Sequence, residues 1–249
     1  MATTPDFGNL DISDFTVGSM LRAGIAIRRV VRGARSLEEA AEVLVRYLYD
    51  HCLDAATGER SCALVRFYKT HPFGDLEAEL QTFAASQLAD ADPSPDMRCL
   101  TLLGTSGDEQ AWNSRHASHG HRAIPLPSVD IVRRAPMIAR LIEEMGLEIE
   151  SVVRGTAPAS RPGDSRTYDV FHVEQALGSE HIPAQDFVER HGIESVVGFG
   201  GLLRTGELFA MILFSRRRIP AASAARFRAI ALDVRSALYA LDESSTWAL

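Results

Sequence analysis

The fold is decided by residues 167–216, which read TYDVFHVEQALGSEHIPAQDFVERHGIESVVGFGGLLRTGELFAMILFSR. Two runs in this stretch, 193–203 and 208–214, are dense in Val, Leu, Ile and Phe, and Gly206 lies in the short break between them. Apolar runs joined by a short glycine-containing break are typical of a β-hairpin. A short helical pattern precedes the hairpin and ends at Gly192. The stretch therefore predicts a strand, a short helix and a central hairpin in that order.

A closing amphipathic helix is predicted over 221–241, because apolar residues recur there at helical spacing. A strand, a crossing segment with a short helix, a glycine-turn hairpin and a closing helix resemble the C-terminal half of GAF domains. The residues that carry this resemblance are 193–197, IESVV, and 206–213, GELFAMIL. The resemblance spans about 36–241. It implies an α+β fold, a GAF-like sandwich with a central mixed or antiparallel sheet and with the N- and C-terminal helices packed on one face. It also implies ligand sensing, and it leaves the ligand open because it is not a catalytic signature.

Composition narrows the classes of function. The 249-residue chain is 46% apolar and carries a net charge of -7, which is ordinary for a globular protein and argues against a nucleic-acid-binding surface. The sequence has no apolar run of about 18 residues and no signal-peptide pattern. We therefore expect a cytoplasmic protein with no membrane partner. Cys52, Cys62 and Cys99 form no Cys-x-x-Cys pair, which predicts buried reduced thiols rather than disulfides or a zinc site.

The chain divides into an N-terminal helical extension, 1–35, and a GAF-like sensory domain, 36–249. Apolar residues three and four apart in the extension predict a helix that packs on its own domain or on a second copy. These residues are Val17, Met20, Gly24, Ile27 and Val31. We favour the second copy, and hence a homodimer.

Ser36 and Glu39 form a capping box that predicts the start of a second helix. Further helices are predicted over 76–88 and 129–145, and further strands over 62–68, 98–104, 147–153 and 170–173. Residues 106–127 have little periodicity, which predicts either a lid over a pocket or an irregular loop. An exposed loop is predicted over 156–166.

Seven residues are predicted to bind a small-molecule ligand in a cavity between the sheet and the segments 108–127 and 168–183. They are Trp112, His116, His121, Phe171, His172, Glu174 and Phe199. His172 interrupts an apolar strand, and alternation places it on the same face as Glu174. If that face lines the cavity, both side chains can hydrogen-bond a polar ligand; if it does not, His172 is a structural residue. Trp112 is either a wall of the cavity or a filler of the core.

Other chemistry finds little support in the sequence. His116, His119 and His121 lie within six residues, but no acidic or cysteine ligand stands beside them, so a polar loop is favoured over a metal site. The run GFGG, 198–201, lies within a strand and predicts a bulge or a close backbone approach rather than a dinucleotide site. The residues with which GAF proteins bind cyclic nucleotides, attach bilins or reduce methionine sulfoxide have no counterpart in this chain. No catalytic residue and no metal site are predicted, and the sequence leaves the cofactor open.

We expect a small-molecule-binding sensory domain of a signal-transduction system that acts through a partner output protein and is not an enzyme. Two other classes stay open. A small enzyme using Cys99 or His172 would need a thiolate of low pKa in an open pocket. A ligand-free interaction scaffold would have a filled core.

Overall fold

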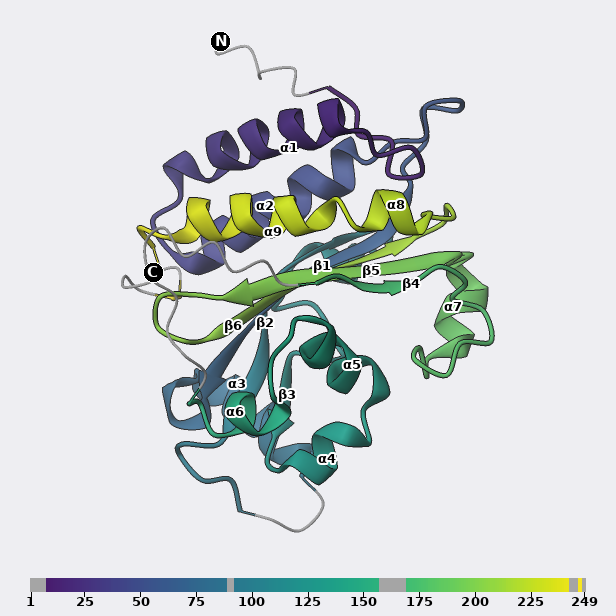
Figure 1. Cartoon of the computed structure of the whole chain (residues 1–249). Helices are drawn as coiled ribbons and strands as arrows, with labels where there is room; N and C mark the ends of the chain where they lie inside the picture. The colour runs from purple at the N-terminus through teal and green to yellow at the C-terminus, as the bar shows by residue number, and fades with distance from the viewer. Residues whose placement is uncertain (1–7, 89–91, 157–168, 242–245, 248–249) are drawn as a thin grey trace.

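The computed structural model describes residues 8–88, 92–156, 169–241 and 246–247. Its centre is a six-stranded sheet in the order β3-β2-β1-β6-β5-β4, and all neighbouring strands run antiparallel (Figure 1). The strands are β1 (Cys62–Pro72), β2 (Arg98–Gly107), β3 (Ala123–Leu126), β4 (Phe171–Val173), β5 (Ser195–Leu202) and β6 (Leu208–Ser215). The predicted α+β class is confirmed. None of the described helices is long and apolar enough to cross a membrane.

One face of the sheet is covered by the N- and C-terminal helices, as predicted (Figure 1). They are α1 (Val17–Val30), α2 (Leu37–His51), the short α8 (Ala221–Ala224) and α9 (Phe227–Leu238). The predicted cap of α2 is present, because Ser36 Oγ accepts from Glu39 N at 3.1 Å. The Glu39 carboxylate accepts from Arg35 N at 2.8 Å, one residue before the position that a capping box uses.

Helix α1 packs on α9 at Gly24, where a Cβ would lie 2.1 Å from Asp233 Oδ2. Ile27 and Val31 of the predicted apolar seam are buried as well. Val17 was predicted to belong to this seam but is exposed, on a second apolar stripe along the outer side of α1. The residues of this stripe are Val17, Leu21 and Ile25, which are 56%, 60% and 47% exposed. The helix therefore buries one apolar side on its own domain and leaves another uncovered.

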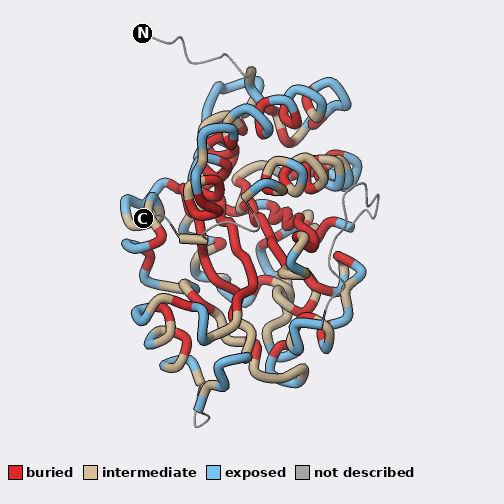
Figure 2. Tube along the Cα trace, turned by 90° about the vertical axis from the view of Figure 1, so that its left-hand side faces the viewer, coloured by how far each residue is buried: buried red, intermediate tan, exposed pale blue. Residues whose placement is uncertain are grey.

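The opposite face of the sheet carries a second layer of short helices, and Figure 2 shows the buried part of the trace running through the sheet and the inner sides of both layers. The layer holds α4 (Val129–Arg133), α5 (Pro136–Glu144), α6 (Ile149–Val153) and α7 (Gln185–His191), while α3 (Ala78–Ser86) lies beside β3. Two predictions are wrong here. The strand predicted over 147–153 is replaced by the helix α6, Ile149–Val153, in which Ile149 and Val152, three apart, are the residues buried on the core. The helix predicted over 129–145 is two helices, because Pro136 starts a new one.

The predicted hairpin is confirmed in full register from Ser195 opposite Ser215 to Leu202 opposite Leu208. Gly206 makes the turn with φ 84°, a left-handed conformation that favours glycine. A Cβ on Gly200 would lie 2.0 Å from the carbonyl oxygen of Phe209. The glycine run in β5 therefore marks a close backbone approach, the second of the two readings predicted for it.

The strands on either side of the hairpin extend further than the sequence predicted. β1 continues beyond the predicted 62–68 to Pro72, and β2 continues beyond the predicted 98–104 to Gly107. Residues 106–127 are not wholly irregular, because β3 lies within them and pairs with residues 98–101 of β2. The predicted loop over 156–166 lies outside the described residues from 157 onward.

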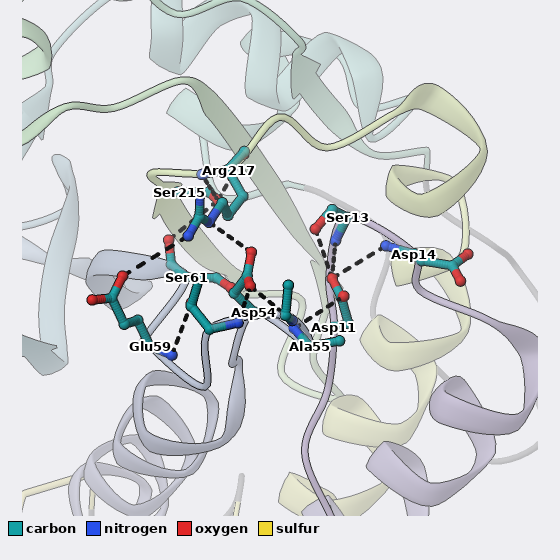
Figure 3. Close-up of polar contacts among 11 residues, drawn as sticks. Asp11, Ser13, Asp14, Asp54, Ala55, Glu59, Ser61, Ser215 and Arg217 are labelled. Atoms are coloured by element: carbon teal, nitrogen blue, oxygen red, sulfur yellow. Dashed lines mark hydrogen bonds and ion pairs between the residues drawn. The ribbon is translucent and has the colours of Figure 1, made fainter.

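The loop between α2 and β1 contacts two other segments of the chain, one before α1 and one after β6 (Figure 3). Ala55 N donates to Asp11 Oδ2 at 3.3 Å, which ties the loop to the start of the chain. Arg217 Nε lies 2.9 Å from Asp54 Oδ2, which ties it to the segment after β6. Ser215 Oγ donates to the carbonyl oxygen of Ser61 at 3.3 Å beside this pair. These contacts hold β1, and the residues it carries, against β6.

Candidate functional site

Residues 114–122, the cover segment, follow the free edge of β2 beyond β3. Leu102 N donates to the carbonyl oxygen of Arg122 at 2.8 Å, which fixes one end of the segment to the strand. Arg115 fixes the other end: its guanidinium, 4% exposed, pairs with Glu38 at the start of α2 and lies 2.8 Å from Glu77 Oε2 before α3. The cover segment is therefore held between the edge of the sheet and two helices.

Arg66 lies beneath this segment, in the middle of β1, on the sheet face opposite α1, α2 and α9. Its cross-strand neighbours are Thr105 on β2 and Ile212 on β6, and residues directly opposite each other share a face of the sheet. Arg66 Nη1 donates to Tyr68 Oη at 3.1 Å, and Nη2 donates to Ser118 Oγ of the cover segment at 3.3 Å. The guanidinium thus joins the sheet to the cover segment through two hydroxyl groups.

Two polar atoms at this place are buried without a hydrogen-bond partner. They are the Nε of Arg66, a residue that is 9% exposed, and the Oγ1 of Thr105, which is 4% exposed. More than nine in ten buried polar groups in folded proteins have a partner, and an unsatisfied one costs about 1–3 kcal/mol. The Nε atoms of Arg98 and Arg122 are buried without a partner as well. What sets Arg66 and Thr105 apart is that their unpartnered atoms belong to residues directly opposite each other on β1 and β2.

His121 ends the cover segment beside Arg66. It has φ 57°, a left-handed conformation that is costly for a residue other than glycine, and no other described non-glycine residue has a positive φ. The residue as a whole is exposed, but desolvation of its ring and the positive charge of Arg66 lower the pKa of His121. The ring is accordingly neutral at pH 7 and can accept or donate a hydrogen bond. Of the seven residues predicted to bind a ligand, His121 is the one that the structure places next to Arg66.

The other two predicted residues of residues 108–127 lie apart from Arg66. The side chain of His116 is 57% exposed, and its Nε2 lies 3.5 Å from Glu38 Oε1. The ring of Trp112 contacts α7, with its centroid 5.7 Å from that of Phe187 and 4.7 Å from that of His191. Trp112 therefore serves as a packing contact between the edge of β2 and α7.

The predicted residues of β4 and β5 are distributed over both layers. His172 Nε2 lies 2.8 Å from the carbonyl oxygen of Ile219, and Glu174 pairs with Arg218 at 2.9 Å. Phe199 is buried under α9. Phe171 is buried in the opposite layer, where the guanidinium of Arg140 lies 5.6 Å from its ring. The structure does not bring these four residues together with His121 into one site.

A separate cleft of about 500 Å³ opens on the helical side of the molecule. It is lined mainly by α2, with residues that include Glu42, Val43, Arg46, Tyr47, Asp50 and His51. Burial, and then the negative charge of Glu38, raise the pKa of Glu42. Thr105 and Ser106 of β2 and Asn113 of the segment 108–127 line this cleft as well, and none of the seven residues predicted to bind a ligand lines it.

Metal and thiol chemistry find no support in the described parts of the chain. No group of three or more His, Cys, Asp and Glu residues there could hold a metal ion. All three cysteines are free and buried, as predicted. Burial raises the pKa of the Cys99 thiol to about 12, and a hydrogen bond with Cys62 together with burial raises that of Cys52. A buried thiol with a raised pKa is a poor nucleophile, because the thiolate is the reactive form.

No protein-family model and no curated protein matches the sequence. Three solved structures that are similar to this chain are GAF domains. One, from a phosphoenolpyruvate-protein phosphotransferase of Coxiella burnetii, is 9% identical over 88% of this chain and 92% of its own, with a TM-score of 0.47. Another, the phycocyanobilin-bound GAF domain of a cyanobacterial phytochrome, is 12% identical over 89% and 94%, with a TM-score of 0.45. A GAF domain from an Acinetobacter phosphoenolpyruvate-protein phosphotransferase is 11% identical over 88% and 92%, with a TM-score of 0.43.

These TM-scores are below 0.5, so the similarities carry no argument about the family, a ligand or a partner of this chain. The site has to be argued from its own residues. Sequence reasoning missed Arg66 and Thr105. The signal was present, because Arg66 interrupts the apolar strand CALVRFY in the same way that His172 interrupts its own.

Proposed function

We propose that this chain is a small-molecule-binding sensory domain whose ligand binds at Arg66 and Thr105, beneath the cover segment. The observation that carries the proposal is the pair of buried, unpartnered polar atoms, Arg66 Nε and Thr105 Oγ1. A ligand that forms hydrogen bonds with both atoms would offset the free-energy cost of burying them without partners. Binding sites typically combine an apolar lining with a few precisely placed polar groups, and Ile212 and Tyr68 supply such a lining here.

The route from this site to an output would run through the cover segment to α2. Ser118 of the cover segment accepts a hydrogen bond from Arg66, and Arg115, three residues earlier, pairs with Glu38 at the start of α2. A ligand that moves the cover segment would therefore act on the helix layer. We propose that the exposed stripe of α1, Val17, Leu21 and Ile25, then joins a second copy or an output protein in the cytoplasm.

Two alternatives from other classes are less well supported. An enzyme using Cys99 needs an accessible thiolate, whereas this thiol is buried with a raised pKa. An interaction scaffold with a filled core would leave Arg66 Nε and Thr105 Oγ1 unsatisfied without any return in binding.

Native mass spectrometry of freshly purified protein tests the proposal, together with a thermal-shift screen of neutral, cationic and anionic metabolites. We expect either a co-purifying molecule or a compound that raises the melting temperature. The Thr105→Val variant, which removes the hydroxyl and keeps the size, should stay folded and respond less. Bare protein that no compound stabilises would contradict the proposal and favour the scaffold.

A further inference from the structure

The buried arginines of this chain differ in their counterions. Arg115 pairs with Glu38 and Glu77. Arg98, whose side chain is 16% exposed, pairs with Glu207. Arg122, whose side chain is 12% exposed, lies 2.7 Å from Glu79 Oε1. Each of these guanidinium groups has at least one carboxylate within hydrogen-bond distance.

Arg66 is the exception, since its partners are the hydroxyl groups of Tyr68 and Ser118. Within residues 8–88, 92–156, 169–241 and 246–247, no carboxylate forms an ion pair with it. An arginine cannot shed its proton to escape burial as a lysine can. A buried charge without a counterion is strongly unfavourable. Among the described residues, Arg66 is therefore a buried positive charge whose hydrogen-bond partners are neutral hydroxyl groups.

We infer that Arg66 binds an anionic group of the ligand, a carboxylate or a phosphate, with Thr105 as a second donor. The inference rests on the proposed function and names the chemical class of its ligand. Arg66 Nε is the donor left over after Nη1 and Nη2 have bonded to hydroxyls. A guanidinium recognises carboxylate and phosphate oxygens with charge-assisted hydrogen bonds, which are stronger than neutral ones.

The groups around Arg66 suit an anion better than a cation or a neutral ligand. Thr105 Oγ1 has a hydrogen to donate and no present acceptor. Tyr68 Oη accepts from Arg66 and so keeps its own hydrogen for donation. The ring of His121, which is neutral because of desolvation and the charge of Arg66, can donate one hydrogen bond. An oxyanion would thus meet one positive charge and several hydroxyl or imidazole donors.

Melting temperatures measured with sodium acetate, acetamide and sodium phosphate, at an ionic strength held constant with sodium chloride, test the inference. Acetamide has the shape of acetate without its charge. We expect acetate or phosphate at about a hundred times its dissociation constant to raise the melting temperature of the wild type by roughly 5 °C or more. The anion that gives the larger shift identifies a carboxylate or a phosphate ligand. Acetamide should have no effect.

Variants separate this site from non-specific ion effects. Arg66→Met should lose the anion response while staying as stable as the wild type without anions, because it removes an unpaired buried charge. Arg98→Met is the matched control, since it removes a half-buried arginine that pairs with its own carboxylate, Glu207, and lies outside the cover segment, and it should respond as the wild type does. If Arg66→Met does not fold, Arg66→Lys keeps the charge without the Nε donor and should bind the anion at least tenfold more weakly.

Three results would overturn the inference: no anion response in the wild type, an equal response in Arg66→Met or Arg66→Lys, or an equal effect of acetamide. Its failure is distinguishable from failure of the proposed function. A neutral molecule that co-purifies with the protein, in the absence of any anion response, would leave the sensory function standing and remove the anionic ligand.

Discussion

Removal of Arg115 should weaken the whole domain, because this residue fastens the cover segment and neutralises a buried acid. The side chain of Glu38 is 5% exposed, and Arg115→Met would remove the buried guanidinium that pairs with it. The second partner, Glu77, is 40% exposed and can rely on solvent. Arg115→Met would also remove the guanidinium that lies 4.8 Å from the ring centroid of Trp247.

Breaking a buried ion pair on one side costs about 3–5 kcal/mol. For a chain of this size such a loss lowers the melting temperature by roughly 6–20 °C. Urea unfolding of Arg115→Met should therefore show a much lower midpoint with an unchanged slope. The double variant Glu38→Gln with Arg115→Met should recover most of the loss, because no uncompensated charge is left in the interior.

The exposed pair between Arg35 and Glu39 of α2 provides the control. Arg35→Met breaks an ion pair at the same end of the same helix, and its urea midpoint should stay where it is. If Arg115→Met behaves like Arg35→Met, or if the double variant is no more stable than Arg115→Met, the reasoning about a buried anchor is refuted.

Three further predictions follow from other parts of the fold. Gly200→Ala should destabilise the hairpin severely, because its Cβ would overlap a backbone oxygen of β6, whereas Gly120→Ala, with open space around it, should not; equal urea midpoints would contradict this. Burial, and then the charge of Lys69, lower the pKa of His71 well below its usual value. Because His71 is protonated more readily in the unfolded chain, the free energy of unfolding should fall as the pH drops below about 6.5. His71→Phe should make this fall with pH less steep, and an equally steep fall in the variant would contradict the prediction. Leu21→Asp, on the exposed stripe of α1, should convert a dimer into a monomer in sedimentation equilibrium without loss of helix content; an unaltered mass would exclude this stripe as the interface.

The parts of the fold that the sequence predicted depend on local signals. The hairpin follows from two apolar runs and Gly206, and the start of α2 follows from Ser36 and its hydrogen bond to Glu39. The failures depend on tertiary packing. Residues 147–153 are short and apolar, and such a run suits a strand as well as a helix until its contacts are known. β3 contains four residues, one of them Pro125, and is defined by its pairing with β2.

The candidate site was harder to predict for the same reason. Its main residues, Arg66 and Thr105, are far apart in sequence and become neighbours only through the antiparallel register of β1 and β2. The sequence predicted that residues 106–127 form a lid or an irregular loop and that His121 binds a ligand. It did not indicate which face of the sheet this segment covers. His172 was singled out by an equally valid local argument, and the structure gives it a backbone carbonyl as its partner. The pairing of residues far apart in the chain decides which of two polar side chains in apolar strands, Arg66 or His172, keeps an atom without a hydrogen-bond partner.

The arginine side-chain Nε–H resonances of the wild-type protein, followed by NMR as acetate or phosphate is added, test the central claim most directly. The Arg66 signal is assigned as the one missing from the spectrum of Arg66→Met. We predict that this resonance moves and saturates, while the signals of Arg98, Arg115 and Arg122, which already have carboxylate partners, stay in place. An Arg66 resonance that does not move, or one that moves no more than the other three, would contradict binding at this site.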